Sequence, residues 1–462
     1  MQSGRDSRLN YSSTCWIDDL PVCKQSGIGF SMNQIYREDG NRQEEHAFED
    51  RSFHCGFHND NNSFLYGVFD GHEGTKAVDY CFQKMPAEIL LGQLNPSMND
   101  EDIKEVLRQA FIGVENGYMD SLNDLLAERA AYDVPEGVNP YDYFKQTELE
   151  HLHQLNANIS SGTAAAIALI YNKTLFVANV GNCRVLLCEN DPNAVLKVIQ
   201  LSIDHDTRNE DEVLRMSQLG LQADRLRKHV RLGNQENTRC LGNHSVKGGY
   251  KEVEDLMKAA QEPIIAEPDI IGGIKLNDSH RFLLLMSSGL YKAIEEAMGT
   301  DQVNKYLAQS VVDQFREQTN ITGVAQAVVD KVVRLHHDWH MTNSLSYDRT
   351  REDITLVVRN FNFPMPNAIR TPTVSFNPLV ATSLISTTPQ STLTNSTSLF
   401  NSEQSNTNTN NYDNTNSSSS SEPALPFPDP DEKIKAYVNF KDFYKNVEIA
   451  KKNGTLPHGL LL

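Results

Sequence analysis

The sequence predicts an α+β protein in which helices cover sheets built from hairpin-joined strands. Apolar runs suited to buried strands recur along the chain, including RFLLLMSSG at 281–289 and ITLVVRNF at 354–361. Between such runs lie long stretches whose apolar residues are spaced three and four apart, as in amphipathic helices. Domains that mix hairpin-joined strands with long helices in this way are typically α+β.

The elements follow in order along the chain. FLYGVFDGHEG, at 64–74, reads as an apolar strand that runs into an acidic, glycine-rich turn. The stretch 100–130 has helical periodicity. Residues 163–188 read as two strands around an Asn172–Lys173 turn, followed by a third strand after Gly181–Asn182.

Composition limits the classes of partner and the cellular location. The 462 residues carry a formal net charge of -19, which argues against a nucleic-acid or anionic-membrane surface. None of the seven cysteines forms a CxxC pair, so we expect reduced thiols and no zinc site or disulfide framework. The N-terminus lacks the apolar segment of a signal peptide, and no run reaches the roughly 20 apolar residues that span a bilayer. We therefore expect a soluble, cytoplasmic protein without membrane insertion.

Composition also divides the chain into four parts. Residues 1–15 are predicted to be flexible, and residues 16–363 to form one globular domain. Residues 364–430 are predicted to be a disordered linker, because 24 of the 31 residues from Ser391 to Ser421 are Ser, Thr or Asn and leave little apolar surface to bury. Residues 431–462 are apolar again and are expected to form a separate docking motif.

The DGHEG turn is a candidate metal site. An Asp that ends a buried strand and is followed by Gly offers two hard oxygen ligands, the carboxylate of Asp70 and the carbonyl of Gly71. Magnesium and manganese prefer such ligands. Taken alone the motif is weak, because acidic turns also end strands for purely structural reasons.

The rest of the domain gives this motif a context. VFDGHEG resembles the DGHGG turn of the metal-dependent PP2C-type serine/threonine phosphatases, and similar segments follow in the family's order. The resemblance implies a β-sandwich of two antiparallel sheets with helices on both outer faces. In active members it implies a two-metal centre that activates a bridging water for attack on a phosphoester. The further matching segments are SGTAAAIALI, LFVANVGNCRVLL, LSIDHDTRNEDEVLRMSQLG, AEPDI, MSSGLYKAI and REDITLVV.

Part of the family's metal shell is retained according to this resemblance. The vestigial ligand positions are Asp70, the carbonyl of Gly71 and Asp353. Two alternatives exist for the acidic pair that precedes the DGH turn. One is Glu38–Asp39, a register that puts Gln34 where the family has its phosphate-binding Arg, and the other is the FED segment at 48–50.

Four other acidic positions of the family carry different residues here. The family's SDGLWD pattern reads SSGLYK at 287–292, so Ser288 replaces a carboxylate that helps to hold two metals. Lys292 replaces a second acid and reverses its charge. Asn182 stands where the family has an Asp associated with a third metal, and Asn243 likewise replaces an Asp.

These changes predict a disabled two-metal centre with no catalytic residue. Two divalent ions about 4 Å apart need several carboxylates to offset their charge. Like charges at that separation repel by about 4 kcal/mol per pair at an effective dielectric constant near 20. Lys292 could pair with Asp70 or Asp353 and stand in for an ion. The alternative is a single weakly held magnesium or manganese ion between those two aspartates.

Histidines are weaker candidates. His72 could act as a base, but a structural hydrogen bond in the turn is at least an equal alternative. His205 is expected to be a structural loop residue. In VVRLHHDWH, His336 and His340 have the i, i+4 spacing of metal-binding helices, but no acidic partner is evident, so we expect a solvated helix end that also carries His337.

A narrower resemblance links the chain to the PP2C-like pseudophosphatase adaptors that bind the TGF-β-activated kinase. CWIDDLPVC, LLGQLN, PEGV, VAQAVVDKV and LVVRNF look like segments of these adaptors, and AYVNFKDFY at 436–444 is similar to their kinase-docking segment. The resemblance implies binding to the kinase's catalytic domain and promotion of its autophosphorylation. The pathways implied are stress, innate-immune and TGF-β/BMP-type signalling. It also implies contacts with an inhibitor-of-apoptosis protein and a p38-type MAP kinase, which the sequence does not assign to residues.

The docking segment fits that role by its own residue spacing. Asn439 is a good helix N-cap with Asp442 at N3, and Gly454 is a stop signal. An isolated helix of this length is marginal in water, so its apolar stripe is expected to fold in a partner's groove, or alternatively to pack on its own domain. Val447 stands where the family tends to have a bulkier aromatic. The predicted docking residues are Tyr437, Val438, Phe440, Phe443, Tyr444 and Val447.

Three functions compete on the sequence alone. The first is the non-catalytic adaptor that activates a MAP kinase kinase kinase. The second is a weak Mg²⁺- or Mn²⁺-dependent serine/threonine phosphatase, supported by the intact DGHEG turn and Asp353. The third is a phosphopeptide-binding module that uses the old cleft, supported only by Lys292.

Overall fold

Two antiparallel sheets pack face to face in the computed structural model, which describes residues 20–37, 43–57, 60–90, 94–132, 143–228, 231–342 and 350–366. One sheet contains, in spatial order, β1 (Ser26–Ser31), β13 (Ile354–Asn360), β11 (His280–Met286), β7 (Arg184–Asn190) and β8 (Leu196–Gln200). The other contains β10 (Asp269–Lys275), β6 (Thr174–Val180), β5 (Gly162–Tyr171), β4 (Asp60–His72) and β3 (Asp50–Phe57), with β9 (Leu241–Gly242) beside β5. A separate ribbon pairs β2 (Gln34–Ile35) with β12 (Thr350–Arg351).

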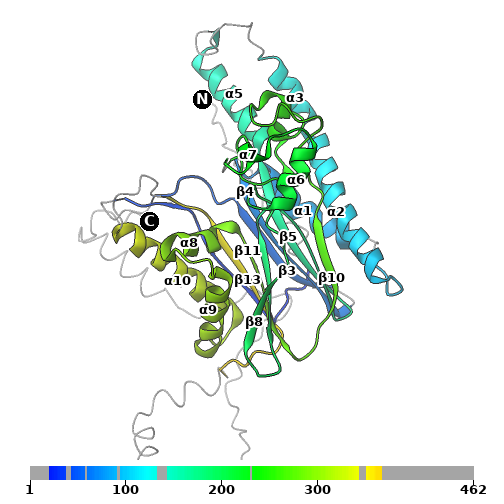
Figure 1. Cartoon of the computed structure of the whole chain (residues 1–462), viewed down its shortest axis with the longest axis vertical. Helices are drawn as coiled ribbons and strands as arrows, with labels where there is room; N and C mark the ends of the chain where they lie inside the picture. The colour runs from blue at the N-terminus through cyan, green and yellow to red at the C-terminus, as the bar shows by residue number, and fades with distance from the viewer. Residues whose placement is uncertain are drawn as a thin grey trace, which may run out of the picture. The chain divides into compact units, whose positions relative to one another are not determined.

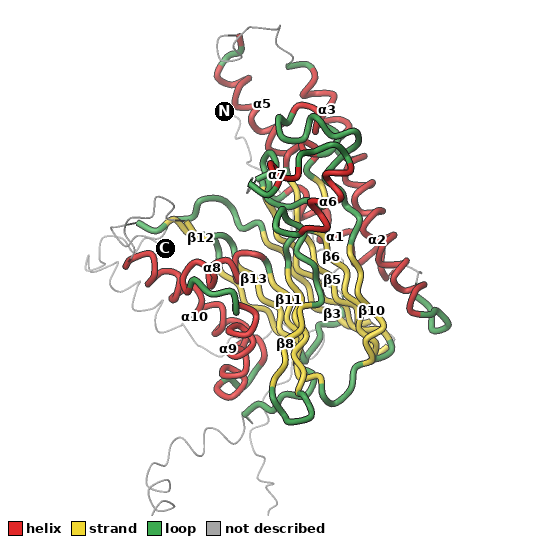
Figure 2. The backbone as a smooth tube through the Cα atoms, in the orientation of Figure 1, coloured by secondary structure: helices red, strands yellow, loops and turns green. Residues whose placement is uncertain are grey.

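Helices cover the outer face of each sheet (Figures 1 and 2). On the six-stranded sheet, α1 (Lys76–Leu90) packs against β4 and β5, and α2 (Asp100–Ser121) packs against β10, β9 and β6. On the five-stranded sheet the cover is formed by α8 (Ser288–Met298), α9 (Val303–Glu317) and α10 (Ile321–Thr342). The predicted sandwich with helices on both outer faces is therefore confirmed. The remaining described helices are α3 (Asn123–Ala130), α5 (Gln146–Ser160), α6 (Glu210–Gln218), α7 (Ala223–Leu226) and the short 3₁₀ turns η2 (His244–Val246) and η3 (Tyr250–Glu252).

Strand β5 shows why the sheets read as continuous apolar runs. Its even-numbered residues, such as Ala166 and Ala168, face the core between the two sheets. Its odd-numbered residues, such as Ile167 and Leu169, face the core under α1 and α2. Because successive side chains of a strand point to opposite faces, a strand covered on both faces needs apolar residues throughout.

Local turn and cap signals explain several element boundaries. Asn172 and Lys173 both have positive φ, 50° and 63°, in the tight turn predicted between β5 and β6. Asn99 caps α2 and forms a reciprocal capping box with Asp102. The helical stretch predicted over 100–130 forms two helices, α2 and α3, which break at the buried Leu122.

The DGH motif does not lie in a turn as predicted, because β4 continues through it to His72. Asp70 is paired with Asp50 on β3 and with Ala164 on β5, so its backbone is held on both sides. The following residue must be small, since a Cβ on Gly71 would lie 2.5 Å from the carbonyl oxygen of Glu49. The turn begins one residue after the strand, at Glu73 and Gly74, which both have positive φ.

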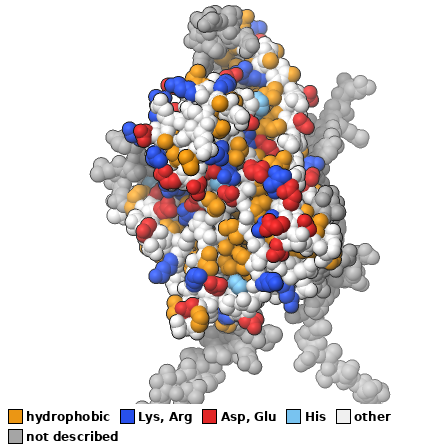
Figure 3. Space-filling model, turned by 45° about the vertical axis from the view of Figure 1, so that its right-hand side comes forward, with side chains coloured by type: hydrophobic (Ala, Val, Ile, Leu, Met, Phe, Trp, Pro, Cys, Tyr) orange, Lys and Arg blue, Asp and Glu red, His pale blue; other side chains and the backbone are white. Residues whose placement is uncertain are grey.

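The charge distribution on the surface and the state of the cysteines can be compared with what the composition predicts. On the face shown in Figure 3, acidic and basic side chains are interspersed and not segregated. The six cysteines among the described residues are buried free thiols. Within the described part of the chain, no helix combines the length and apolar character needed to cross a membrane. The predicted flexible N-terminus (1–15), the docking motif (431–462) and all but the first residues of the predicted linker lie outside the described residues.

Candidate functional site

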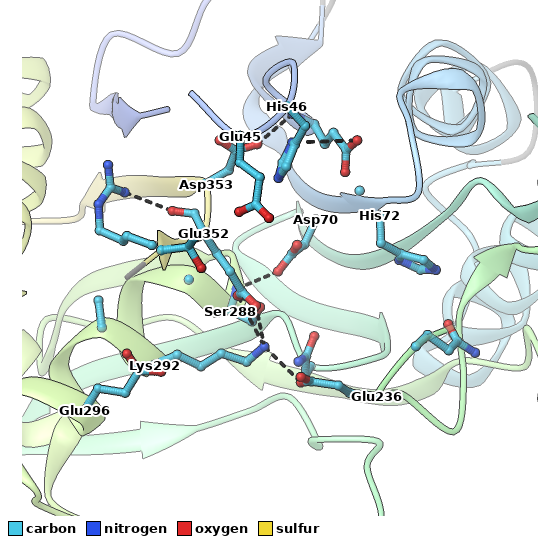
Figure 4. Close-up of a pocket in the computed structure, with 18 of the residues that line it drawn as sticks. Glu45, His46, Asp70, His72, Glu236, Ser288, Lys292, Glu296, Glu352 and Asp353 are labelled. Carbon is cyan, nitrogen blue, oxygen red and sulfur yellow. Dashed lines mark hydrogen bonds and ion pairs between the residues drawn. The ribbon is translucent and has the colours of Figure 1, made fainter. Parts of the chain in front are cut away.

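A cleft of about 880 Å³ opens where β4 ends, α8 begins and β12 leads into β13 (Figure 4). Its walls come from segments far apart in the sequence, since the loop 231–237 and the end of α10 also contribute. The cleft brings together six of the vestigial and degraded positions that the sequence singled out, namely Asp70, Gly71, Asn182, Ser288, Lys292 and Asp353, whereas Asn243 is not among its lining residues.

The carboxylate of Asp353 is held by N–H groups. One oxygen accepts hydrogen bonds from the backbone and side-chain N–H groups of Asn33, at 2.6 and 2.9 Å. The other accepts one from the backbone N–H of Glu49 at 2.8 Å. Asp353 therefore fastens the segment before β3 to the start of β13.

Asp70 lies at the N-terminus of α8. One of its oxygens accepts a hydrogen bond of 2.7 Å from the backbone N–H of Ser288, the first residue of that helix. Burial, followed by the nearby charge of Glu352, raises the pKa of Asp70 to about 6, although Lys292 and Ser288 act in the opposite direction. The helix N-terminus thus supplies part of the positive potential that an acid in this position requires.

Asp50 is the most exceptional group in the cleft region. It is 1% exposed and lies opposite Asp70 in the ladder between β3 and β4. Neither of its carboxylate oxygens makes a hydrogen bond among the described residues. Burial and the neighbouring Asp70 raise its pKa well above the ordinary value, an effect that the hydroxyls of Ser287 and Thr355 reduce.

These positions favour one of the two alternatives for the family's acidic pair. Glu49 lines the cleft beside Asp50, whereas Glu38 and Asp39 lie outside the described residues. With Glu49 and Asp50 as the pair, the same spacing moves the position of the phosphate-binding Arg from Gln34 to Glu45, which lines the cleft. An acidic side chain at that point would repel a phosphate.

Lys292 forms ion pairs different from those that the sequence suggested. Its amino group lies 2.9 Å from Glu236 and 3.2 Å from Glu352, and the expected pairing with Asp70 or Asp353 is wrong. Burial opposes the charged form, but the carboxylates of Glu352 and Glu236 outweigh it and raise the pKa of Lys292. Figure 4 shows this side chain reaching across the cleft floor between the two glutamates.

Ser288 and Gly289 fit closely against the neighbouring strand. The hydroxyl of Ser288 donates to Glu352 over 3.4 Å. A Cβ on Gly289 would collide with the carbonyl oxygen of Asp353. The start of α8 is therefore positioned by direct backbone contact with the loop that leads into β13.

A pair of divalent ions does not fit this arrangement of donors. Ser288 offers no carboxylate, Lys292 adds a positive charge, and both oxygens of Asp353 already accept N–H groups. The unpartnered oxygens of Asp50 beside Asp70 fit one cation better than two. Magnesium or manganese would be the matching ion, because the donors are all hard oxygens.

Asn243 and His72 contact each other in this geometry, whereas Asn182 is fixed through its backbone. Asn182 is 4% exposed, and its backbone carbonyl oxygen accepts a hydrogen bond from the hydroxyl of Tyr291. Asn243 has a positive φ of 60° and places its amide 3.2 Å from Nε2 of His72. Burial, with Arg231 and Lys247, lowers the pKa of His72 to about 4, so the ring is neutral at physiological pH.

Two histidines contradict the expectation of a solvated helix end. His336 and His340 on α10 are 1% and 8% exposed, and both line the cleft. The acidic partner that the sequence did not reveal is Glu296 on α8, 2.8 Å from Nε2 of His336. His337, between them, is exposed as expected. His205 is buried, with Nε2 2.8 Å from Asp269, in the structural role predicted for it.

Comparison with known proteins identifies the class. The sequence profile of the Protein phosphatase 2C family matches residues 30–332, and the chain belongs to this family. A relative named "Probable protein phosphatase 2C 2", from Paramecium tetraurelia, is 28% identical over 248 residues, which cover 54% of this chain and 70% of the relative. A solved structure of serine-threonine phosphatase 2C from Toxoplasma gondii covers 74% of this chain and 97% of its own, with 14% identity and a TM-score of 0.49.

Another relative carries a different kind of name. The Caenorhabditis elegans protein "TGF-beta-activated kinase 1 and MAP3K7-binding protein 1" is 24% identical over 352 residues. The match covers 74% of this chain and 82% of that protein. The family relatives thus include proteins named as phosphatases and one named for binding a kinase.

Proposed function

We propose that this chain is a non-catalytic adaptor that binds the catalytic domain of a TGF-β-activated kinase and promotes its autophosphorylation. The observation that carries the proposal is the arrangement around Lys292, which fills an acid position of the family and pairs with Glu236 and Glu352. A fixed internal cation repels divalent ions and occupies acids that could otherwise bind them. A cleft built in this way supports a protein that no longer depends on metal-assisted hydrolysis.

The kinase as partner is supported by two independent features. Similarity to the C. elegans protein named for kinase binding extends over 74% of the chain, compared with 54% for the Paramecium phosphatase. The segment 437–447 has an apolar stripe of the kind that binds in a protein groove, although it lies outside the described residues. Stress, innate-immune and TGF-β/BMP-type pathways belong to the same proposal, as do an inhibitor-of-apoptosis protein and a p38-type MAP kinase as further partners.

A calorimetric titration of the full chain into the kinase catalytic domain tests the proposal. We expect a dissociation constant in the micromolar range or tighter. Phe443→Ala removes the central aromatic of the stripe and is expected to weaken binding by at least about 30-fold, as for a typical hot-spot residue. Lys441→Ala, next to the stripe but on another face of the predicted helix, is the matched control and should bind as the wild type does. No binding by the wild type, or equal binding by both variants, would sink the proposal.

One observation favours a second candidate, a weak metal-dependent serine/threonine phosphatase. The unpartnered oxygens of Asp50 beside Asp70 are the donors that a single magnesium or manganese ion would use. Under this alternative, the full chain would dephosphorylate a phosphothreonine peptide in the presence of Mn²⁺. Asp70→Ala would abolish that turnover, whereas a contaminating phosphatase would be unaffected by the substitution.

A further inference from the structure

The end of α10 carries a side-chain cluster that the proposed function does not use. His336 and His340 are four residues apart on α10, and Glu296 approaches them from α8. One nitrogen of each histidine and one carboxylate oxygen lie within 4.8 Å of one another. We propose that Glu296, His336 and His340 form a binding site for one transition-metal ion, with Zn²⁺ as the preferred ion.

The donor set distinguishes this site from the acids around Asp70. Two imidazole nitrogens and one carboxylate oxygen suit zinc and its neighbours in the first transition row, whereas magnesium and manganese favour sites made entirely of oxygen. Two histidines at i and i+4 present their rings on the same face of a helix, which is a recurrent way to hold zinc. A carboxylate from a second helix completes a three-ligand set that leaves a fourth position open.

The spacing requires only small adjustments of the side chains. Three atoms within 4.8 Å of one another can all lie within about 2.8 Å of a common point, which is 4.8 Å divided by the square root of three. Zinc binds nitrogen and carboxylate oxygen at about 2.0–2.2 Å. Each donor atom therefore needs to move by less than about 1 Å. Nε2 of His336 and Oε2 of Glu296 are already 2.8 Å apart.

The surroundings resemble the outer shell of a metal site. The hydroxyl of Tyr36 lies 2.9 Å from Nδ1 of His336, so a hydrogen bond to the nitrogen that faces away from the proposed ion fixes the orientation of the ring. If Nε2 binds the ion, the ring proton moves to Nδ1, where the oxygen of Tyr36 can accept it. Such a hydrogen bond to the outer nitrogen is found at almost all metal-binding histidines. The Tyr36 ring also packs against His340, with centroids 4.8 Å apart.

The proposed zinc site is open to solvent through the cleft, and a bound ion would link α8 to α10. Both histidines are buried, whereas the Glu296 side chain is 54% exposed, and all three residues line the large cleft. An ion can therefore enter from the cleft, toward which the fourth position would face. Because α8 begins at Ser288, a bound ion would tie the wall of the degraded centre to α10.

Zinc titration of the untagged full-length chain, after treatment with a chelator, tests this proposal. Calorimetry is expected to give one zinc equivalent per chain that excess Mg²⁺ does not displace. Co²⁺ in place of zinc is expected to give the intense visible absorption of a four-coordinate site. His336→Gln and His340→Gln should each abolish that band and the tight zinc equivalent. Glu296→Gln, at a half-exposed position that is safe for folding, should weaken zinc binding by at least 10-fold.

The chain supplies matched controls. His337→Gln alters the exposed neighbouring histidine and should leave zinc binding unchanged, and Asp70→Asn should do the same because it affects the other metal position. Tyr36→Phe removes only the outer hydrogen bond and should weaken zinc binding by about 10-fold. The proposal is overturned if the wild type lacks the Co²⁺ band, or if Glu296→Gln and the two buried-histidine variants bind zinc as tightly as His337→Gln does. Circular dichroism of each variant in chelator separates loss of binding from loss of fold.

Discussion

The carboxylate of Asp70 accepts a hydrogen bond of 2.7 Å from the backbone N–H of Ser288. The resemblance to the family predicts a metal-ligand position at Asp70, and at Ser288 a position where the family has a carboxylate. Because Ser288 begins α8, the retained acid now faces a helix N-terminus, where the helix dipole favours negative charge. Lys292, one turn further along α8, supplies a full positive charge to the same cleft. Internal groups thus take over part of the charge balance that metal ions provide in a two-metal centre.

Asp50→Asn is expected to stabilise the fold at neutral pH in the presence of a chelator. The substitution removes a buried carboxyl group whose oxygens make no hydrogen bond of normal length among the described residues, and it removes the repulsion between that group and Asp70. We expect the free energy of unfolding to rise by about 1–3 kcal/mol, the usual range for an unsatisfied buried polar group. Urea denaturation at constant pH measures the difference.

The control is the pH dependence of the difference in free energy of unfolding between Asp50→Asn and the wild type. The folded-state pKa of Asp50 lies above its ordinary value of 3.8, so the folded state binds more protons than the unfolded state between the two values. The wild type therefore gains stability from this group as the pH falls through the folded-state pKa, and the variant lacks that gain. The advantage of Asp50→Asn should shrink on acidification. A variant less stable than the wild type at pH 7 would contradict this reading of Asp50.

The contribution of Glu212 to stability is expected to change with pH in the opposite direction to that of Asp50. Although its burial favours the neutral acid, hydrogen bonds from Arg239 and Arg215 outweigh burial and lower its pKa to about 2. Its contribution is present above the ordinary value of 4.5 and is lost as the pH falls toward 2. Glu212→Gln leaves Arg215 without its anion and Arg239 with only Asp269, 3.6 Å away, and is expected to reduce stability by about 3 kcal/mol at pH 7. The matched control, Glu210→Gln in the exposed first turn of the same helix, should change little.

Restoring both acids at the start of α8 should restore a response to metal. In Ser288→Asp/Lys292→Asp, added carboxylates repel Asp70 and Glu352 in chelator, so the thermal midpoint should fall below that of the wild type. Mn²⁺ at about 100 times its dissociation constant should then stabilise the variant by about 2.7 kcal/mol. Differential scanning calorimetry with and without Mn²⁺ measures both effects. An equal Mn²⁺ shift in the wild type would mean that its centre is not disabled.

Two glycine substitutions in helices should have opposite effects. Gly289→Ala drives a methyl group into the carbonyl oxygen of Asp353 and is expected to reduce stability by about 2 kcal/mol. Gly113→Ala, at an exposed position of α2 where the nearest atom would be 3.5 Å away, should increase stability by about 0.5–1 kcal/mol through helix propensity. Chemical denaturation of both variants checks the pair. If Gly289→Ala is as stable as Gly113→Ala, the close approach at α8 has been misread.

The periodic and motif-bearing parts of the fold could be predicted from the sequence. The continuous apolar run of β5, the turn at Asn172–Lys173 and the helical covers all have local signals. The extension of β4 through Asp70 to His72 could not be predicted locally. It depends on pairing with β3 and β5, which hold an acidic, glycine-containing segment in an extended conformation.

The site shows the same division between local and long-range information. The sequence places Ser288 and Lys292 in the candidate site because dense matching segments fix the register around them, and both residues line the cleft. The partners of Lys292 were predicted incorrectly, since Glu236 lies in a loop 56 residues earlier and Glu352 lies 60 residues later. Glu296 was missed beside His336 for the same reason, being 40 residues away in sequence. Residue spacing carries no information on contacts formed by loops and helices that meet only in the folded chain.

Kinase autophosphorylation in the presence of the full-length chain tests the central claim most directly. The account predicts that the wild type and Asp70→Asn stimulate autophosphorylation equally, because the adaptor role does not depend on the old metal ligand. Phe443→Ala should lose the stimulation, whereas Lys441→Ala should keep it. Equal stimulation by Phe443→Ala, or loss of stimulation in a folded Asp70→Asn protein, would contradict the account.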